Sequence, residues 1–188
     1  MRLLTNIVDA GLGLARAFAR SEHGGPASEF AMTAPIFIVL ILGTFQIGII
    51  YFANAYLETA AEQAARLVLT NNATTTSNGA TTPMNAQQFQ TAVCGNISML
   101  FTCGNIMINL APATSETSIS TAAPTFNANG TLANNLNFQI PPTGQIGVLQ
   151  IMYEWPVIGL PLGVTFGSLG NGAYLMMSTQ VFMVEPAT

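Results

Sequence analysis

Residues 24–57, GGPASEFAMTAPIFIVLILGTFQIGIIYFANAYL, decide the architecture of this chain. The stretch Phe30–Phe52 has no charged residue, and at about 1.5 Å per helical residue it spans roughly 35 Å, enough to cross the hydrocarbon core of a bilayer. A secretory signal peptide has a shorter apolar region, of about 7–15 residues. Tyr51 and Phe52 end the stretch with aromatic rings suited to a membrane interface. The sequence therefore predicts a single membrane-spanning helix.

The distribution of arginine predicts the orientation of this helix. The chain contains no lysine, and Arg2, Arg16 and Arg20 precede the apolar stretch, whereas Arg66 alone follows it. Positive residues near a membrane helix stay on the cytoplasmic side. We therefore expect a single-pass protein with a cytoplasmic N-terminus and an exported C-terminal part.

Composition excludes several classes of function. Half of the residues are hydrophobic, 6% are charged, and the net charge is −4. An exported part with one arginine has no basic surface, which excludes nucleic-acid binding. The one histidine, His23, precedes the apolar stretch, so the exported part has no Ser/His/Asp set and no His/Cys zinc spacing. Glu116, Glu154 and Glu185 lie far apart in the sequence. We expect no enzyme, no cofactor and no metal site, with Glu154 as a solvated or hydrogen-bonded strand residue.

The chain divides by pattern into three parts: a cytoplasmic leader (1–24), a membrane helix with an exported extension (25–70), and an exported domain (71–188). The leader combines leucines with clustered arginines, which favours a basic amphipathic helix on the membrane surface. Beyond the bilayer, small and apolar residues recur at helical spacing, and Glu58, Glu62 and Arg66 follow one another at i, i+4 and i+8. The long helix should therefore continue to about Thr70.

The exported domain should have an α+β fold with a small antiparallel sheet packed on helical segments. Asn71–Thr82 contains only polar and small residues and is expected to be a linker or loop, and Met84 to about Phe101 has helical spacing. Alternating apolar residues predict three strands, at Asn105–Leu110, Gly147–Trp155 and Tyr174–Val184. The Thr- and Asn-rich stretch Ala113–Pro142 should be a surface excursion, part of which can pair as an edge strand.

Cys94 and Cys103 are the only cysteines, and both lie in the exported part. Oxidising compartments favour a disulfide between such a pair. In one unbroken helix the two residues would be about 13 Å apart, too far to bond, so a disulfide requires a bend, for which Gly95 is the candidate. Two buried free thiols are the alternative.

Glu29 is the sharpest candidate for a functional side chain. A carboxylate at the mouth of a membrane helix is costly unless it is paired or lies near the helix N-terminus. Two explanations remain open: pairing with a neighbouring molecule, or a local role in which Ser28 caps the helix and Glu29 occupies its first turn. Within the membrane, Gln46 and the pair Thr44 and Gly48 are candidates for seating a neighbouring helix.

These residues together resemble the TadE family of pseudopilins, the minor pilin-like proteins of tight-adherence, or Flp-type, pilus systems. The matching residues are Ser28-Glu29-Phe30-Ala31 with Pro35, the unbroken apolar helix, Glu62-Gln63-Ala64-Ala65-Arg66, the spaced Cys94 and Cys103, Tyr153-Glu154-Trp155-Pro156, and Glu185-Pro186.

The resemblance implies a role in pilus assembly and no catalytic reaction. It implies insertion in the bacterial inner membrane, cleavage by a prepilin peptidase after Gly24 or, one bond later, after Gly25, and contact with platform proteins and other pilins. With cleavage after Gly24, Glu29 becomes the fifth mature residue, where pilin-like proteins carry an acid that pairs with a neighbour's N-terminal amine. The alternative is an unprocessed, signal-anchored exported domain that binds a ligand or a wall component.

Overall fold

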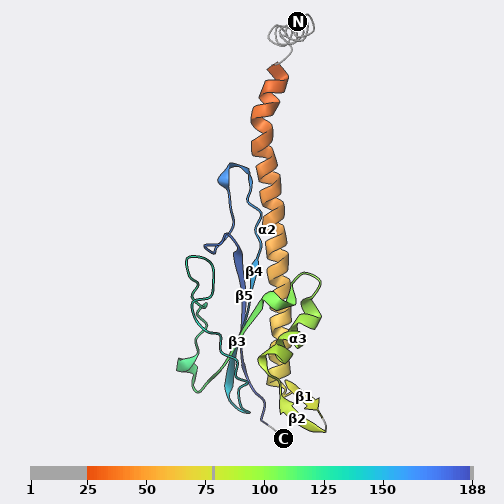
Figure 1. Cartoon of the computed structure of the whole chain (residues 1–188), viewed down its shortest axis with the longest axis vertical. Helices are drawn as coiled ribbons and strands as arrows, with labels where there is room; N and C mark the ends of the chain where they lie inside the picture. Colours follow the sequence, from red (N-terminus) through yellow and green to blue (C-terminus); the bar gives the residue numbers. More distant parts are fainter. Residues whose placement is uncertain (1–24, 78, 187–188) are drawn as a thin grey trace, which may run out of the picture. The chain divides into compact units, whose positions relative to one another are not determined.

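The computed structural model describes residues 25–77 and 79–186 (Figure 1). The expected leader, residues 1–24, with its basic amphipathic helix, lies outside the described residues. The chain divides into two units between Gly43 and Thr44, and the long helix α2 (Gly25–Leu69) contributes to both. The fold is α+β, with a long N-terminal apolar helix followed by small antiparallel sheets, as the sequence predicts.

The helix α2 has 45 residues and is therefore about 67 Å long. It ends in a Schellman motif, in which Asn72 N–H donates to Leu67 O (2.8 Å) and Asn71 N–H donates to Val68 O (3.1 Å). Asn71 adopts a left-handed backbone conformation, with φ of 56°, which asparagine tolerates better than most residues. The predicted end near Thr70 is confirmed.

The second half of α2 uses small side chains to pack closely on the sheet. Ala53, Leu57, Ala60, Ala64 and Val68 are all buried, and their spacing places them on one face of the helix. The sheet contributes the other half of the same hydrophobic core. Burial of this face fixes the second half of α2 against the strands.

The sheet has the order β3-β4-β5 and is antiparallel throughout. Its strands are β3 (Ile106–Ala113), β4 (Ile146–Trp155) and β5 (Tyr174–Met183), close to the three predicted ranges. Alternate residues face α2, so that Ile108, Ile151 and Ser178 lie in one cross-strand row and are all buried. The apolar residues that alternate in the sequence therefore form the inner face of this sheet.

The prediction that Asn71–Thr82 forms a linker or loop is wrong. The segment contains β1 (Thr74–Ser77), which pairs with β2 (Ala80–Pro83) in an antiparallel hairpin. Asn78-Gly79 separates the strands, and Gly79 has a φ of 80°, the conformation that tight hairpin turns require. Threonine favours strands, so an uncharged Thr-rich segment around Asn-Gly was a hairpin signal.

The helix α3 spans Ala86–Ile97, inside the predicted range. Its start is fixed by a capping box, in which Asn85 Oδ1 accepts from Gln88 N–H (2.9 Å) and Gln88 Oε1 accepts from Asn85 N–H (3.0 Å). The bend expected at Gly95 is absent, because the helix continues through it to Ile97. The turn that follows brings Cys103 back to Cys94, with their Cα atoms 5.5 Å apart, within disulfide reach.

The long excursion between β3 and β4 is held on the outer face of the sheet by two amide side chains. Gln150, which is 2% exposed, accepts from Asn109 Nδ2 (2.8 Å) and donates from Nε2 to Ala122 O (3.0 Å). Asn109 Oδ1 accepts from Asn137 N–H (2.9 Å). Near its end the excursion forms a parallel bridge between Phe138 and Leu110, a short version of the edge pairing that the sequence left open.

Candidate assembly interface

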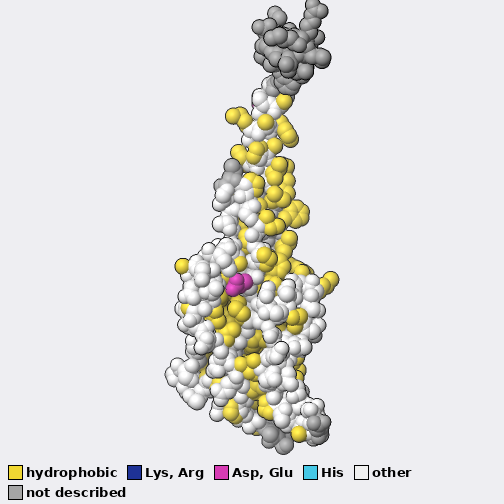
Figure 2. All heavy atoms as spheres, viewed as in Figure 1, with side chains coloured by type: hydrophobic (Ala, Val, Ile, Leu, Met, Phe, Trp, Pro, Cys, Tyr) yellow, Lys and Arg dark blue, Asp and Glu magenta, His cyan; other side chains and the backbone are white. Residues whose placement is uncertain are grey.

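The first half of α2 exposes large apolar side chains on all sides. The exposed fraction is 71% for Phe30, 79% for Met32 and 64% for both Phe37 and Leu40. Figure 2 shows hydrophobic side chains at the surface along the upper part of the helix. The stretch Ala27–Leu69 is long and apolar enough to cross a membrane, with a mean hydropathy of 2.4 in its most apolar window. A helix that is apolar all round needs a membrane or other helices to cover it.

Glu29 is exposed and is the only charged side chain in this half of α2. It is the fifth residue of the described helix, so it lies beyond the first turn. Its backbone carbonyl accepts a hydrogen bond from Thr33 Oγ1 (3.0 Å), and its carboxylate has no ion pair within the described residues. The carboxylate is therefore free to pair with a group from another molecule.

Of the two explanations left open for Glu29, the structure contradicts the one in which Ser28 caps the helix. The helix already includes Gly25, and Ser28 Oγ donates to the carbonyl of Gly25 (2.8 Å), a bond to the preceding turn. The reason is that Gly25 and Pro26 are compatible with the first helical turn, where a proline loses no intrahelical hydrogen bond. Glu29 thus has no place in a capping motif at Ser28, which weakens the purely local explanation of its charge.

Of the two glycines of the expected cleavage site, the structure describes only the second, Gly25. Gly24 lies outside the described residues, and Gly25 is exposed at the start of α2. A Cβ atom built on Gly25 would meet nothing within 4 Å. Gly25 is therefore accessible in this structure, which a peptidase site requires.

The polar and small residues expected to seat a neighbouring helix lie at the beginning of the second unit. Gln46 is half-buried, and Thr44 and Gly48 are exposed. A Cβ atom on Gly48 would have no neighbour within 4 Å, so its surface is open to close approach by another helix.

Five aromatic rings link α2 to the sheet, an arrangement that sequence reasoning missed. Phe52 stacks on Tyr56, Tyr56 on Phe101, and Phe101 meets the edges of Tyr153 and Trp155 at centroid distances of 4.8 and 5.9 Å. The i, i+4 spacing of Phe52 and Tyr56 was visible, but Phe101, the next ring in the cluster, is 45 residues beyond Tyr56. This cluster fixes the point at which the second half of α2 meets β4.

The charged face of the α2 extension is solvent-exposed, as its spacing predicts. Glu58, Glu62 and Arg66 are all exposed, and no salt bridge joins them within the part of the chain that the structure describes. Glu154 accepts a hydrogen bond from Asn171 Nδ2 (2.9 Å), which is the structural role expected of it. Among the described residues no group of three or more His, Cys, Asp or Glu side chains could hold a metal ion.

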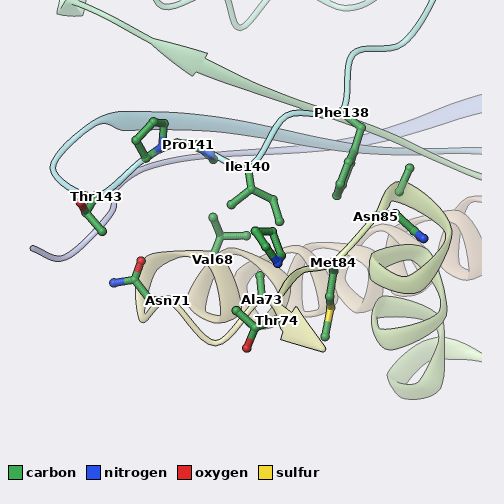
Figure 3. A pocket seen from close by; sticks show the side chains of 13 residues that line it. Val68, Asn71, Ala73, Thr74, Met84, Asn85, Phe138, Ile140, Pro141 and Thr143 are labelled. Carbon is green, nitrogen blue, oxygen red and sulfur yellow. The ribbon is translucent and has the colours of Figure 1, made fainter. Parts of the chain in front are cut away.

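A cavity of about 690 Å³ lies between the end of α2, the β1-β2 hairpin and the end of the excursion. Figure 3 shows Ile140 and Phe138 on one side of it and Val68 and Met84 on the other. Its polar lining side chains are Asn71, Thr74, Asn85 and Thr143, and none of its lining residues is charged. The cavity therefore offers apolar contact and hydrogen bonds, with no titratable group for acid–base chemistry.

Comparison with protein-family models supports the resemblance found in the sequence. Residues 26–66 match the family model described as TadE-like protein. The match covers most of α2, including Glu29 and the Glu62–Arg66 run. Comparison with curated proteins and with solved structures found no match.

Proposed function

We propose that this chain, whose residues 26–66 are TadE-like, is a membrane-inserted minor pilin-like component of tight-adherence (Flp-type) pilus assembly with no catalytic role. The observation that carries the proposal is the difference in burial between the two halves of α2. Its first half presents an uninterrupted apolar surface with one carboxylate, and its second half is built into a folded α+β domain. The first half needs a bilayer or a helical bundle around it, and the second half does not.

The proposed life cycle begins in the bacterial inner membrane, with the N-terminus in the cytoplasm and the domain after α2 exported. A prepilin peptidase removes the leader after Gly24 or Gly25. The processed protein then joins other pilins or pseudopilins through the assembly platform proteins, and it contacts membrane lipid before it does so. Domain bounds of 1–24, 25–70 and 71–188 follow from the same scheme.

Glu29 supplies the proposed recognition in the membrane. Removal of the leader creates a positively charged amine about one helical turn before the carboxylate, since Glu29 is the fifth residue of α2. In a bundle of parallel helices, the amine of one subunit can pair with the Glu29 carboxylate of its neighbour. The low dielectric of the surroundings strengthens such a pair, and an unpaired carboxylate there is costly.

The test is Glu29→Gln in the native host, because glutamine keeps the size of the side chain and removes its charge. We expect the variant to insert and to be cleaved by the peptidase, but to lose incorporation into, or support of, the pilus. The matched control is Glu58→Gln, which removes an exposed carboxylate from the extension of the same helix. Shed-filament yield is the measurement. Normal yield from Glu29→Gln would refute the ion-pair role.

An unprocessed, signal-anchored domain that binds a ligand or a wall component is the second candidate. The apolar cavity beside Ile140 and Met84 favours it, because a small apolar group would fit there. N-terminal sequencing of the protein purified from its host separates the two. An intact leader supports the anchored binding domain, and a new N-terminus at Gly25 or Pro26 supports the pilin-like component.

A further inference from the structure

The two edges of the three-stranded sheet differ in how they are protected. An exposed edge strand presents unpaired backbone N–H and C=O groups, and natural proteins usually cover or interrupt such edges. On β3, Leu110 N–H donates to Asn137 O and Leu110 O accepts from Gln139 N–H, both at 2.8 Å. Ile106 O accepts from Gln90 Nε2 (2.7 Å), and Pro112 has no N–H to offer. The β3 edge is therefore interrupted by other chain segments at Ile106 and Leu110 and by a proline at position 112, whereas no bond to the outward groups of Ile108 is found among the described residues.

The β5 edge is closed only at its two ends. At one end Leu175 N–H donates to Ser168 Oγ (2.9 Å). At the other end Glu185 N–H donates to Leu69 O (3.0 Å), and Glu185 O accepts from Asn71 Nδ2 (3.0 Å). These bonds come from odd-numbered residues, because the backbone groups of even-numbered residues point toward β4, as in the bond from Val184 N–H to Gln145 O.

Between these ends four residues point their backbone groups at an open edge. They are Met177, Thr179, Val181 and Met183, and within the described residues none of their outward N–H or C=O groups has a hydrogen-bond partner. The segment is about 20 Å long. It contains no charged residue, proline or bulge, which are the usual devices against pairing.

The side chains of the same residues leave apolar surface beside the open edge. Val181 is 46% exposed and Met183 is 61% exposed, whereas Val148, which pairs with Val181 on β4, is buried. Figure 2 shows hydrophobic side chains at the surface where Figure 1 draws the strands. An added strand would therefore gain both backbone hydrogen bonds and apolar contacts.

We infer that the β5 edge, residues 177–183, receives an extended, uncharged segment of about seven residues from a different exported protein, which adds a fourth strand to the sheet. The segment must be uncharged because it would lie beside Val181 and Met183, where no described group of opposite charge is available to pair with it. The inference rests on the proposed function in one respect, the shared orientation of membrane-anchored subunits.

That orientation argues against the β5 strand of a second copy of this chain as the donor. The strand β5 runs in the same direction as α2. Its end lies at the end of α2, because Glu185, which follows β5, donates a hydrogen bond to Leu69 O. The antiparallel strand β4 agrees with this direction, because its Tyr153 contacts Phe101, which also contacts Tyr56, farther back along α2. Antiparallel β5–β5 pairing would turn one α2 upside down in the membrane. Parallel pairing of two β5 strands about a two-fold axis would place each residue directly opposite the same residue of the other copy. Hydrogen bonds between parallel strands require the two strands to be offset by one residue, so this pairing cannot form a ladder.

The first experiment is photo-cross-linking of the full chain in its native host, with benzoylphenylalanine in place of Val181. Substitution at Met107, on the outer face of β3, whose edge is interrupted by other chain segments, is the control. We expect an adduct from position 181 only, and mass spectrometry should map it to an uncharged segment of another exported protein. An adduct with a second copy of this chain, no adduct, or an equal adduct from position 107 would each overturn the inference.

The second experiment tests the backbone role. Proline at Thr179 removes one outward N–H and is tolerated at an edge, so Thr179→Pro should lower the adduct yield about five- to tenfold, the effect of losing about one hydrogen bond. Thr179→Val should leave the yield unchanged. If Thr179→Pro does not fold, Val181→Lys with the photoprobe at Met183 replaces it, and the same loss is expected. An unchanged yield from a folded variant contradicts strand addition.

Amide hydrogen exchange gives an independent result on the unmodified protein. In the purified chain, the amides of residues 177, 179, 181 and 183 should exchange at least about tenfold faster than those of 176, 178, 180 and 182, and binding should remove the difference. Leader cleavage measured in the same cells separates the two proposals. A cleaved protein without the adduct overturns only the strand addition, and an uncleaved protein without it overturns both.

Discussion

Loss of the Cys94–Cys103 link should destabilise the domain that follows α2 by a predictable amount. The two residues are separated by 9 positions, and the chain-entropy relation for a loop of that length gives about 2.6 kcal/mol at 25 °C. The best single substitution is Cys103→Ala, because Cys103 is exposed while Cys94 is 2% exposed and stays in the core as a small apolar side chain. The cavity contribution is then small. For a unit comprising residues 44–188, the loss corresponds to a fall of about 10 °C in Tm.

The assay is thermal unfolding in detergent, followed by near-ultraviolet circular dichroism. The signal reports directly on this region, because Phe101 lies in the closed loop and packs on Tyr153 and Trp155. Reduced wild-type protein should match Cys103→Ala, and Thr102→Ala, an exposed neighbour, should match the oxidised wild type. Equal Tm values for Cys103→Ala and oxidised wild type would refute the loop-entropy reasoning. Recovery of both cysteines as alkylatable thiols would show that the disulfide does not form.

Three further outcomes are expected. A phosphatase fused after Thr188 should be active, because the arginine bias exports the C-terminal part; activity only from a cytoplasmic reporter would reverse the topology. Gln150→Leu should lower the free energy of unfolding by about 1–3 kcal/mol and speed proteolysis within residues 113–142, because Asn109 Nδ2 and Ala122 O lose their partner. Urea unfolding and limited proteolysis measure these two effects, and an excursion as resistant as that of the wild type would contradict the prediction. Thr179 pairs with Gln150 across the strands, and its hydroxyl is buried without a partner in the described structure. Thr179→Val should therefore leave the free energy of unfolding unchanged or raise it by up to about 1 kcal/mol. A lower urea midpoint would show that the hydroxyl has a hydrogen-bond partner.

The sequence determined the elements whose signals are periodic and long. The apolar run after Glu29 defined α2, and alternation in Gly147–Trp155 and Tyr174–Val184 defined two strands of the sheet to within one residue at each end. These patterns are readable because each states which face of one element is buried, and burial repeats every 3.6 or 2 residues.

Shorter local signals were present in the sequence but need the right turn chemistry to interpret. Asn78-Gly79 marked the β1-β2 hairpin, and Asn85 with Gln88 marked the start of α3. The local roles expected of Gly95 and Ser28 were wrong, because a helix tolerates one glycine and a serine inside its first turns when the rest of its residues favour it.

Tertiary structure alone decided what lies next to what. The aromatic cluster around Phe101, the amide pair Asn109 and Gln150, and the return of Cys103 to Cys94 join residues whose spacing carries no common period. The contrast between an interrupted β3 edge and an open β5 edge is of the same kind. The two strands have similar alternating sequence patterns. The tertiary structure alone shows which of their backbone groups are already bonded, through the positions of Gln90, the 137–139 segment and Leu69. The physical reason is that hydrogen bonds at a sheet edge depend on chain segments distant in sequence.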